Sequence, residues 1–170
     1  MAETKNLDAI ALLKKDHDEV EDLFKQFSNA SGEGRKEKLA RQICQELTIH
    51  AQIEEEIFYP ACEGKVDEDL LKESYVEHDA AKVMIAEIEA GEPSDEFYDA
   101  KVKVLCEEIE HHVQEEEKRM EGLFAQAKKA GLDMDALGEQ LAQRKAELLQ
   151  QAEAGELPAP QPKTLSETNA

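Results

Sequence analysis

Two stretches of the chain pair a histidine with a glutamate four residues later, His50 with Glu54 and His112 with Glu116. This spacing puts both side chains of a pair on one face of a helix. In each stretch the same face is otherwise apolar, so an imidazole and a carboxylate point toward the expected core. Burying both without partners is costly. A metal ion satisfies both groups, because it binds a neutral imidazole nitrogen and an anionic oxygen together.

Two further histidines, His17 and His78, lie in apolar stripes of their own. Four histidines on four separate stripes at similar depth predict one shared, buried metal site. The chain also contains His111, but the face through His111 is mixed and wet, so His112 is the expected ligand and His111 is expected to be exposed or to support a ligand. The four stripes, with steps of three and four residues, are Ile10, Leu13, Val20, Phe24 and Phe27; Leu39, Ile43, Leu47, Ile57 and Ala61; Leu71, Tyr75, Ala81, Ile85 and Ile88; and Leu105, Ile109, Met120 and Leu123.

Four imidazoles and two carboxylates exceed what a tetrahedral zinc site needs. They suit two octahedral transition metals with bridging carboxylates, non-haem iron first and manganese second. Coordination positions left open would take solvent, O₂, peroxide or nitric oxide. Weaker candidates are Glu21 and the hydroxyls of Tyr59 and Tyr75, whereas Glu55, Glu56, Glu115 and Glu117 are expected to face solvent or to support the ligands. Of these, Glu117 becomes a ligand candidate if its helix is rotated.

Helical periodicity and turn residues predict an all-α protein, an up-down-up-down four-helix bundle with an additional C-terminal helix and a disordered tail. We expect the bundle over residues 6–131, the extra helix over 132–154 and the tail over 155–170. Expected caps are Asn6, Asp67, Ser94 and Asp133. The first helix is expected to end at about residue 27. The following helices are expected over about residues 35–61, 68–90, 95–129 and 133–154.

The composition narrows the class of protein. Net charge is −20, from 40 acidic and 20 basic residues among 170, which argues against binding nucleic acid or an anionic membrane. The absence of a long apolar run and of a signal-like N-terminus makes a cytoplasmic protein the expectation. The three cysteines form no Cys-x-x-Cys motif, so we expect reduced thiols and no thiolate zinc site.

In order along the chain, these motifs resemble those of the hemerythrin-like, or HHE cation-binding, family over about residues 8–130. The resemblance implies two non-haem iron ions (Fe²⁺/Fe³⁺) joined by an oxo or hydroxo bridge and two carboxylates, in a centre that can bind O₂. Carried over residue by residue, it implies the ligands His17, His50, Glu54, His78, His112 and Glu116. The motifs are Asp16-His17, His50-x-x-x-Glu54-Glu55-x-x-Phe58-x-Pro60, Glu77-His78 and His111-His112-x-x-x-Glu116-Glu117.

One position departs from the oxygen-carrying members of the family, which have a second histidine one turn after the ligand corresponding to His78. Here that residue is Lys82, and Ser74 stands one turn before. The site is therefore one imidazole short, and solvent, a tyrosine or another carboxylate would fill the gap.

The expected function is binding of O₂, nitric oxide or peroxide for sensing, storage or the handling of oxidative or nitrosative stress. The alternatives are an enzyme of catalase or peroxidase type and an iron-binding or iron-sensing protein. A ferritin-type iron store is less favoured, since its Glu-x-x-His pattern occurs only at Glu108 and His111. A purely structural bundle with hydrogen-bonded core histidines remains as the non-metal alternative.

Overall fold

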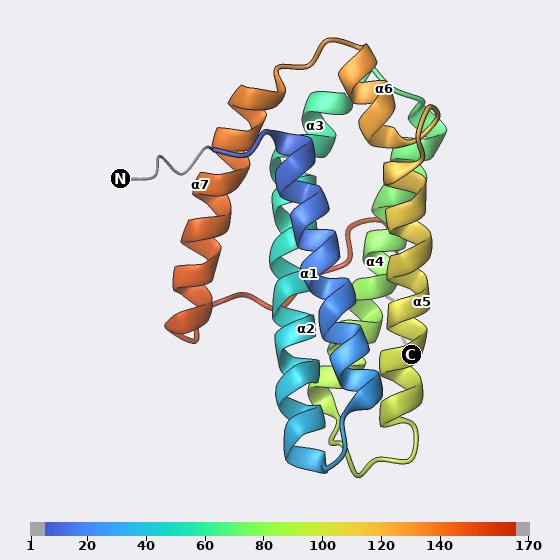
Figure 1. Ribbon diagram of the computed structural model, residues 1–170, viewed down its shortest axis with the longest axis vertical. Coiled ribbons are helices and arrows are strands. Elements are labelled where there is room, and N and C mark those ends of the chain that lie inside the picture. Colours follow the sequence, from blue (N-terminus) through green and yellow to red (C-terminus); the bar gives the residue numbers. More distant parts are fainter. Residues whose placement is uncertain (1–5, 166–170) are drawn as a thin grey trace.

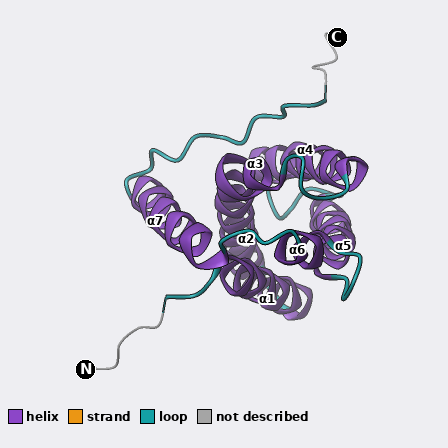
Figure 2. Ribbon diagram, turned by 90° about the horizontal axis from the view of Figure 1, so that it is seen from above, coloured by secondary structure: helices purple, strands orange, loops and turns teal. Residues whose placement is uncertain are grey.

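The computed structural model describes residues 6–165, and these form helices and connecting loops without a strand. Four long helices make the bundle: α1 (Ala9–Asn29), α2 (Glu33–Ile53), α4 (Glu68–Ala90) and α5 (Tyr98–Glu117). They alternate in direction and stand at the corners of a square when viewed from the end (Figures 1 and 2). The predicted all-α bundle is confirmed.

Short acidic side chains begin three of the helices. Asp67 and Asp133 accept hydrogen bonds from backbone N–H groups three residues ahead, as the sequence predicted. At α1 the cap is Asp8, whose Oδ1 accepts the N–H of Ala11 at 2.8 Å. The prediction of Asn6 as this cap was wrong by two residues.

The second bundle helix does not keep a regular α-helical register to its end. After Ile53 the chain makes a π-helical turn, η1 (Glu54–Phe58), and then the short α3 (Tyr59–Cys62). The N–H of Tyr59 bonds to the carbonyl of Glu54, five residues back. Such a turn contains an additional residue, so it rotates everything that follows. Tyr59 is therefore fully buried, whereas Ile57, which regular periodicity placed on the inward stripe, is only half-buried.

The predicted helix over 95–129 is interrupted. α5 ends at Glu117, the chain turns between residues 118 and 122, and α6 (Leu123–Lys129) then covers the end of the bundle. Gly122 permits this turn, because a Cβ there would lie 2.6 Å from backbone atoms of Lys118. Met120 falls in the turn and is 84% exposed, so its predicted place in the stripe was wrong, whereas Leu123 is fully buried as expected.

The last helix, α7 (Met134–Glu153), packs outside the square against α1 and α2 (Figure 2). The contact with the start of α1 is so close at Gly138 that a Cβ would collide with the backbone at Leu7 and Asp8. Close approach of this kind explains a glycine inside a helix despite its low helix propensity.

Beyond α7 the structure describes the expected tail as far as residue 165. Residues 155–165 form an irregular segment that crosses to α4, where Asp79 accepts hydrogen bonds from the backbone N–H groups of Lys163, Thr164 and Leu165. A buried carboxylate thus anchors the end of a stretch that has few large apolar side chains. Residues 166–170 of the predicted tail lie outside the described residues.

The apolar core has two halves. One lies toward the loop that joins α1 to α2, and the other lies toward α3, α6 and α7. Between them the helices carry a layer of buried polar side chains. The bundle therefore encloses this polar layer, the polar chamber, between two apolar core regions.

Candidate metal centre

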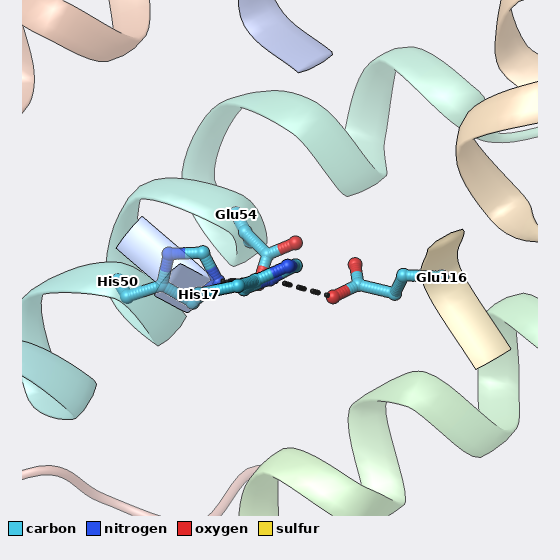
Figure 3. A group of neighbouring side chains, drawn as sticks. All are labelled: His17, His50, Glu54 and Glu116. Carbon is cyan, nitrogen blue, oxygen red and sulfur yellow. Dashed lines mark hydrogen bonds and ion pairs between the residues drawn. The ribbon is translucent and has the colours of Figure 1, made fainter. Parts of the chain in front are cut away.

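All six residues predicted as metal ligands meet in this buried layer. His17 comes from α1, His50 from α2, His78 from α4 and His112 from α5. Glu54, at the start of η1, and Glu116, on the last turn of α5, are both fully buried. Figure 3 shows Glu116 pointing toward His17, His50 and Glu54 from the opposite side of the bundle. The ligand atoms form two groups that share a carboxylate: His17, His50, Glu54 and Glu116 in one, and Glu54, His78 and His112 in the other.

The imidazoles are arranged as two facing pairs. The Nε2 atoms of His17 and His50 are 3.1 Å apart, and those of His78 and His112 are 3.0 Å apart. Within each pair the ring planes are steeply inclined, at 67° and 62°. Each pair thus directs two nitrogen atoms at one small region, as two ligands of one cation do.

The two carboxylates lie between the pairs. Oε1 of Glu54 is 2.7 Å from Nε2 of His50 and 3.4 Å from Nε2 of His78. Oε1 of Glu116 is 3.1 Å from Nε2 of His112 and 3.4 Å from Nε2 of His17. Each carboxylate therefore contacts one histidine of either pair, which is the placement that a bridging ligand of two metal ions requires.

Every imidazole in the cluster also has a carboxylate at its other ring nitrogen. The Nδ1 atoms lie between 2.9 and 3.1 Å from these carboxylate oxygens. A neutral imidazole that donates its Nδ1–H to a carboxylate presents a lone pair at Nε2. Carboxylate–histidine–metal arrangements of this kind fix the orientation of metal-binding rings. The four pairs are His17 with Glu117, His50 with Asp16, His78 with Glu55 and His112 with Glu77.

Three carboxylate oxygens in the chamber are left without hydrogen bonds from residues 6–165: both of Glu54 and Oε1 of Glu116. The nearby Nε2 atoms are close enough but do not offer these oxygens a well-directed N–H. Buried polar atoms are nearly always hydrogen-bonded in folded proteins. Orphaned anionic oxygens beside four converging imidazole nitrogens therefore fit a bound cation, and a harder metal with mixed N and O ligands fits better than a thiolate-seeking one.

Buried histidines and glutamates in the same chamber shift one another's pKa values. Burial disfavours a charged His112, yet the Glu116 carboxylate outweighs burial and raises the pKa of His112 to about 10. Burial likewise opposes ionisation of Glu116, but His112 and His17 hold the pKa of this carboxyl well below its usual range. In the metal-free protein, protons therefore partly neutralise the cluster, and a metal ion must displace them.

Tyr59 is the residue that sequence reasoning ranked too low. Its hydroxyl lies 3.1 Å from Nε2 of His78, 3.2 Å from Nε2 of His112 and 3.1 Å from Oε2 of Glu116. Regular helical spacing from His50 and Glu54 does not bring Tyr59 inward. Only the π-helical turn does, and the signal available in the sequence was Pro60, which removes a backbone donor just after it.

The structure separates the other candidates. Glu55 and Glu117 support His78 and His17. His111 is exposed and pairs with Glu77 from outside. Lys82 stands where the oxygen-carrying members of the family have a second histidine, one turn after the ligand corresponding to His78. It is buried, and its ammonium lies 2.9 Å from Glu55. The hydroxyl that lies beside the second pair of imidazoles is that of Tyr59.

An apolar cavity of about 30 Å³ adjoins the cluster. All four imidazoles contribute to its wall, and the remainder is mostly aliphatic, including Val20, Leu47, Ile85 and Ile109. This space is large enough for a diatomic molecule or a water.

The cysteines take no part in the cluster. Cys44 and Cys62 are buried and Cys106 is half-buried, and no disulfide links them. Burial raises the pKa of Cys44 and Cys62 to about 12 and that of Cys106 to about 11, so all three are thiols at neutral pH. The expectation of reduced, unreactive cysteines fits this environment.

Comparisons with known proteins agree with the geometry. The model of the hemerythrin HHE cation-binding domain matches residues 8–124. A crystal structure of a hemerythrin HHE cation-binding-domain protein from Mycobacterium kansasii superimposes with a TM-score of 0.71 at 22% identity, covering 88% of this chain and 94% of that one.

A curated relative, named as a DNA nickase from Nostoc sp. strain PCC 7120, is 29% identical over 106 residues. The match spans 62% of this chain but 30% of that protein. Across residues 6–165, the helices of this chain are too polar or too short to cross a bilayer. With the family motif and its buried His/Glu cluster both present, the chain belongs to the hemerythrin HHE cation-binding family.

Proposed function

We propose that the cluster holds two non-haem iron ions, joined by an oxo or hydroxo bridge, and that the protein binds O₂ or a related small ligand such as nitric oxide or peroxide. The observation that carries this proposal is the pair of facing imidazole pairs with two carboxylates shared between them. His17, His50, Glu54 and Glu116 would hold one ion, and His78, His112 and Tyr59 the other with the same carboxylates.

The chain supplies two further elements of this function. Carboxylates at the Nδ1 atoms keep each Nε2 free as a ligand. The mostly aliphatic cavity beside the imidazoles has room for a diatomic molecule. Two iron ions, when bound, supply the electrons that a captured O₂ requires.

Free thiols support the cytosolic location expected from the sequence, because reducing compartments keep cysteines unpaired.

The direct test is anaerobic iron loading followed by optical spectra before and after O₂ and nitric oxide. The proposal predicts new charge-transfer bands with either gas, and predicts their loss in His112→Ala but not in His111→Ala, a neighbour that is 65% exposed. If the optical spectrum of the iron-loaded wild-type protein changes with neither O₂ nor nitric oxide, small-ligand binding is refuted.

A second candidate is turnover of peroxide, of the catalase or peroxidase type. The tyrosine hydroxyl in the second imidazole pair and the lysine at position 82 favour it, because they depart from the ligand pattern of the oxygen carriers. Steady release of O₂ from added peroxide, abolished by His112→Ala, would establish this candidate. Stoichiometric bleaching without continued O₂ release, and without sustained oxidation of an added reductant, would exclude it.

We assign no nucleic-acid activity to this chain. Its net charge of −20 repels a phosphate backbone. The activity in the name of the Nostoc relative belongs to a protein of which only 30% is matched.

A further inference from the structure

The four carboxylates that orient the imidazoles fall into two classes. The side chains of Glu117 and Glu77, behind His17 and His112, are 29% and 22% exposed. The side chains of Asp16 and Glu55, behind His50 and His78, are 4% and 1% exposed, and each contacts a lysine ammonium. Each imidazole pair therefore contains one ring held from the surface and one held by a buried ion pair.

The lysine at Asp16 comes from α7, outside the segment matched by the family model. Nζ of Lys145 lies 2.5 Å from Oδ1 of Asp16, while Oδ2 of Asp16 accepts Nδ1–H of His50 at 2.9 Å. The carboxylate is thus fixed at both oxygens. The position of α7 is itself fixed by the close backbone contact at Gly138.

The lysine at Glu55 is held by the C-terminal segment. Nζ of Lys82 donates to Oε1 of Glu55 at 2.9 Å and to the carbonyl of Gln161 at 3.2 Å, and Oε2 of Glu55 accepts Nδ1–H of His78 at 3.0 Å. The ammonium of Lys163 adds a second cation 3.3 Å from Oε1 of Glu55. Asp79, one residue after His78, accepts the backbone N–H groups that fasten this segment to α4.

We propose that α7 and residues 155–165 brace the metal centre, with Lys145 and Lys82 as positioning residues for His50 and His78. This inference rests on the proposed metal function. A buried carboxylate with only one hydrogen-bonded oxygen is free to rotate away from its imidazole, and the ring then loses its fixed Nε2 direction. The lysines remove that freedom, so one histidine of each pair is rigid before the metal arrives.

The neighbouring residue Arg144 provides a matched control. It stands next to Lys145 in α7 and pairs with Glu56 at 2.8 Å, so it also ties α7 to the bundle. The hydrogen bonds of Glu56 go to Gln52 and Arg144, and in the described chain none goes to an imidazole. Loss of Arg144 therefore weakens the docking of α7 without touching a ligand.

The experiment measures anaerobic Fe(II) affinity by competition in the full-length chain, for wild type and for Lys145→Met, Lys145→Arg, Lys82→Met and Arg144→Met. We expect Lys145→Met and Lys82→Met to bind iron at least about 10-fold more weakly, as loss of a group behind a metal-binding histidine typically does. Lys145→Arg, which keeps the cation, and Arg144→Met should stay within about twofold of wild type.

The outcomes separate this inference from the proposed function. Iron binding by wild type with an unchanged affinity in Lys145→Met and Lys82→Met would overturn the brace and leave the function standing. Equal weakening in Lys145→Met and Arg144→Met would also overturn it, because docking of α7 alone would then explain the effect. A wild-type protein that binds no iron would overturn both.

Discussion

Nε2 of His78 faces Nε2 of His112 at 3.0 Å inside the bundle. Because each ring has a carboxylate at Nδ1, both Nε2 atoms carry lone pairs when the rings are neutral. Two lone pairs at this distance repel each other unless a proton or a metal ion lies with them. The metal-free protein therefore holds protons in the chamber, and metal binding should relieve the repulsion and stabilise the fold.

Bound metal should raise the melting temperature. At a free Fe(II) concentration about 100 times the dissociation constant, binding adds about 2.7 kcal/mol to the free energy of unfolding. For a chain of this size that corresponds to roughly 5–10 °C. Differential scanning calorimetry under argon should show the rise in wild type and in His111→Ala and its absence in His112→Ala. A rise that survives His112→Ala would place the metal elsewhere.

Acid should destabilise the metal-free protein through Glu55. Burial raises the pKa of this carboxyl, but His78 and Lys82 outweigh burial and lower it to about 2 in the folded chain, against about 4.3 when unfolded. A lowered folded pKa stabilises the protein above pH 4.3, and this contribution of about 3 kcal/mol disappears as the pH falls toward 2. Denaturant titrations between pH 7 and pH 2 should show the loss in wild type and a flatter profile in Glu55→Gln.

Glu56→Gln is the control for that series, since Glu56 is exposed and pairs with Arg144 at the surface. It should change the free energy of unfolding by less than about 1 kcal/mol. An acid profile in Glu55→Gln as steep as that of wild type would show that other carboxylates dominate acid unfolding.

Tyr59→Phe should weaken the metal site formed by His78 and His112 and spare the other. Its hydroxyl is within 3.2 Å of both these rings, and a phenyl group offers no donor atom there. Metal titrations should then resolve one tight equivalent and one weakened by about 10-fold. Tyr75→Phe, a ring packed 5.1 Å from that of Tyr59, should titrate like wild type. Two tight equivalents in Tyr59→Phe would show that solvent completes the second site.

Gly138→Ala should destabilise the protein by about 1–3 kcal/mol, because the added methyl group collides with the backbone at the start of α1. Gly34→Ala is the opposite case. No atom lies within 4 Å of a Cβ at this helical position, so alanine should stabilise the fold by up to about 1 kcal/mol. Urea denaturation distinguishes the two signs. A neutral Gly138→Ala would mean that α7 moves outward without loss.

Periodicity sufficed for the parts of the molecule that are regular. The α4 helix begins after Asp67 and ends before Gly91 as predicted, and the inward histidines of α1, α2, α4 and α5 all reach the centre. Where the backbone departs from 3.6 residues per turn, extrapolation failed. The π-helical turn brought Tyr59 inward in place of Ile57, and the turn at Gly122 left Met120 outside.

Contacts between segments distant in sequence could also not be predicted from the spacing of residues along the chain. Lys145 and Asp16 are 129 residues apart, and nothing local to either predicts their ion pair. The segment 155–165 has the composition expected of a tail, and nothing in that composition predicts its hydrogen bonds to Asp79 on α4. The sequence thus predicted residues that the structure brings together, and the tertiary structure was needed to find what holds them.

The most direct test of the di-iron proposal is the number of iron ions bound per chain after anaerobic loading and removal of excess metal. The facing imidazole pairs predict two, falling to one or none in His112→Ala. Retention of no iron by the wild-type chain, or of two iron ions by the His112→Ala variant, would contradict the proposed centre.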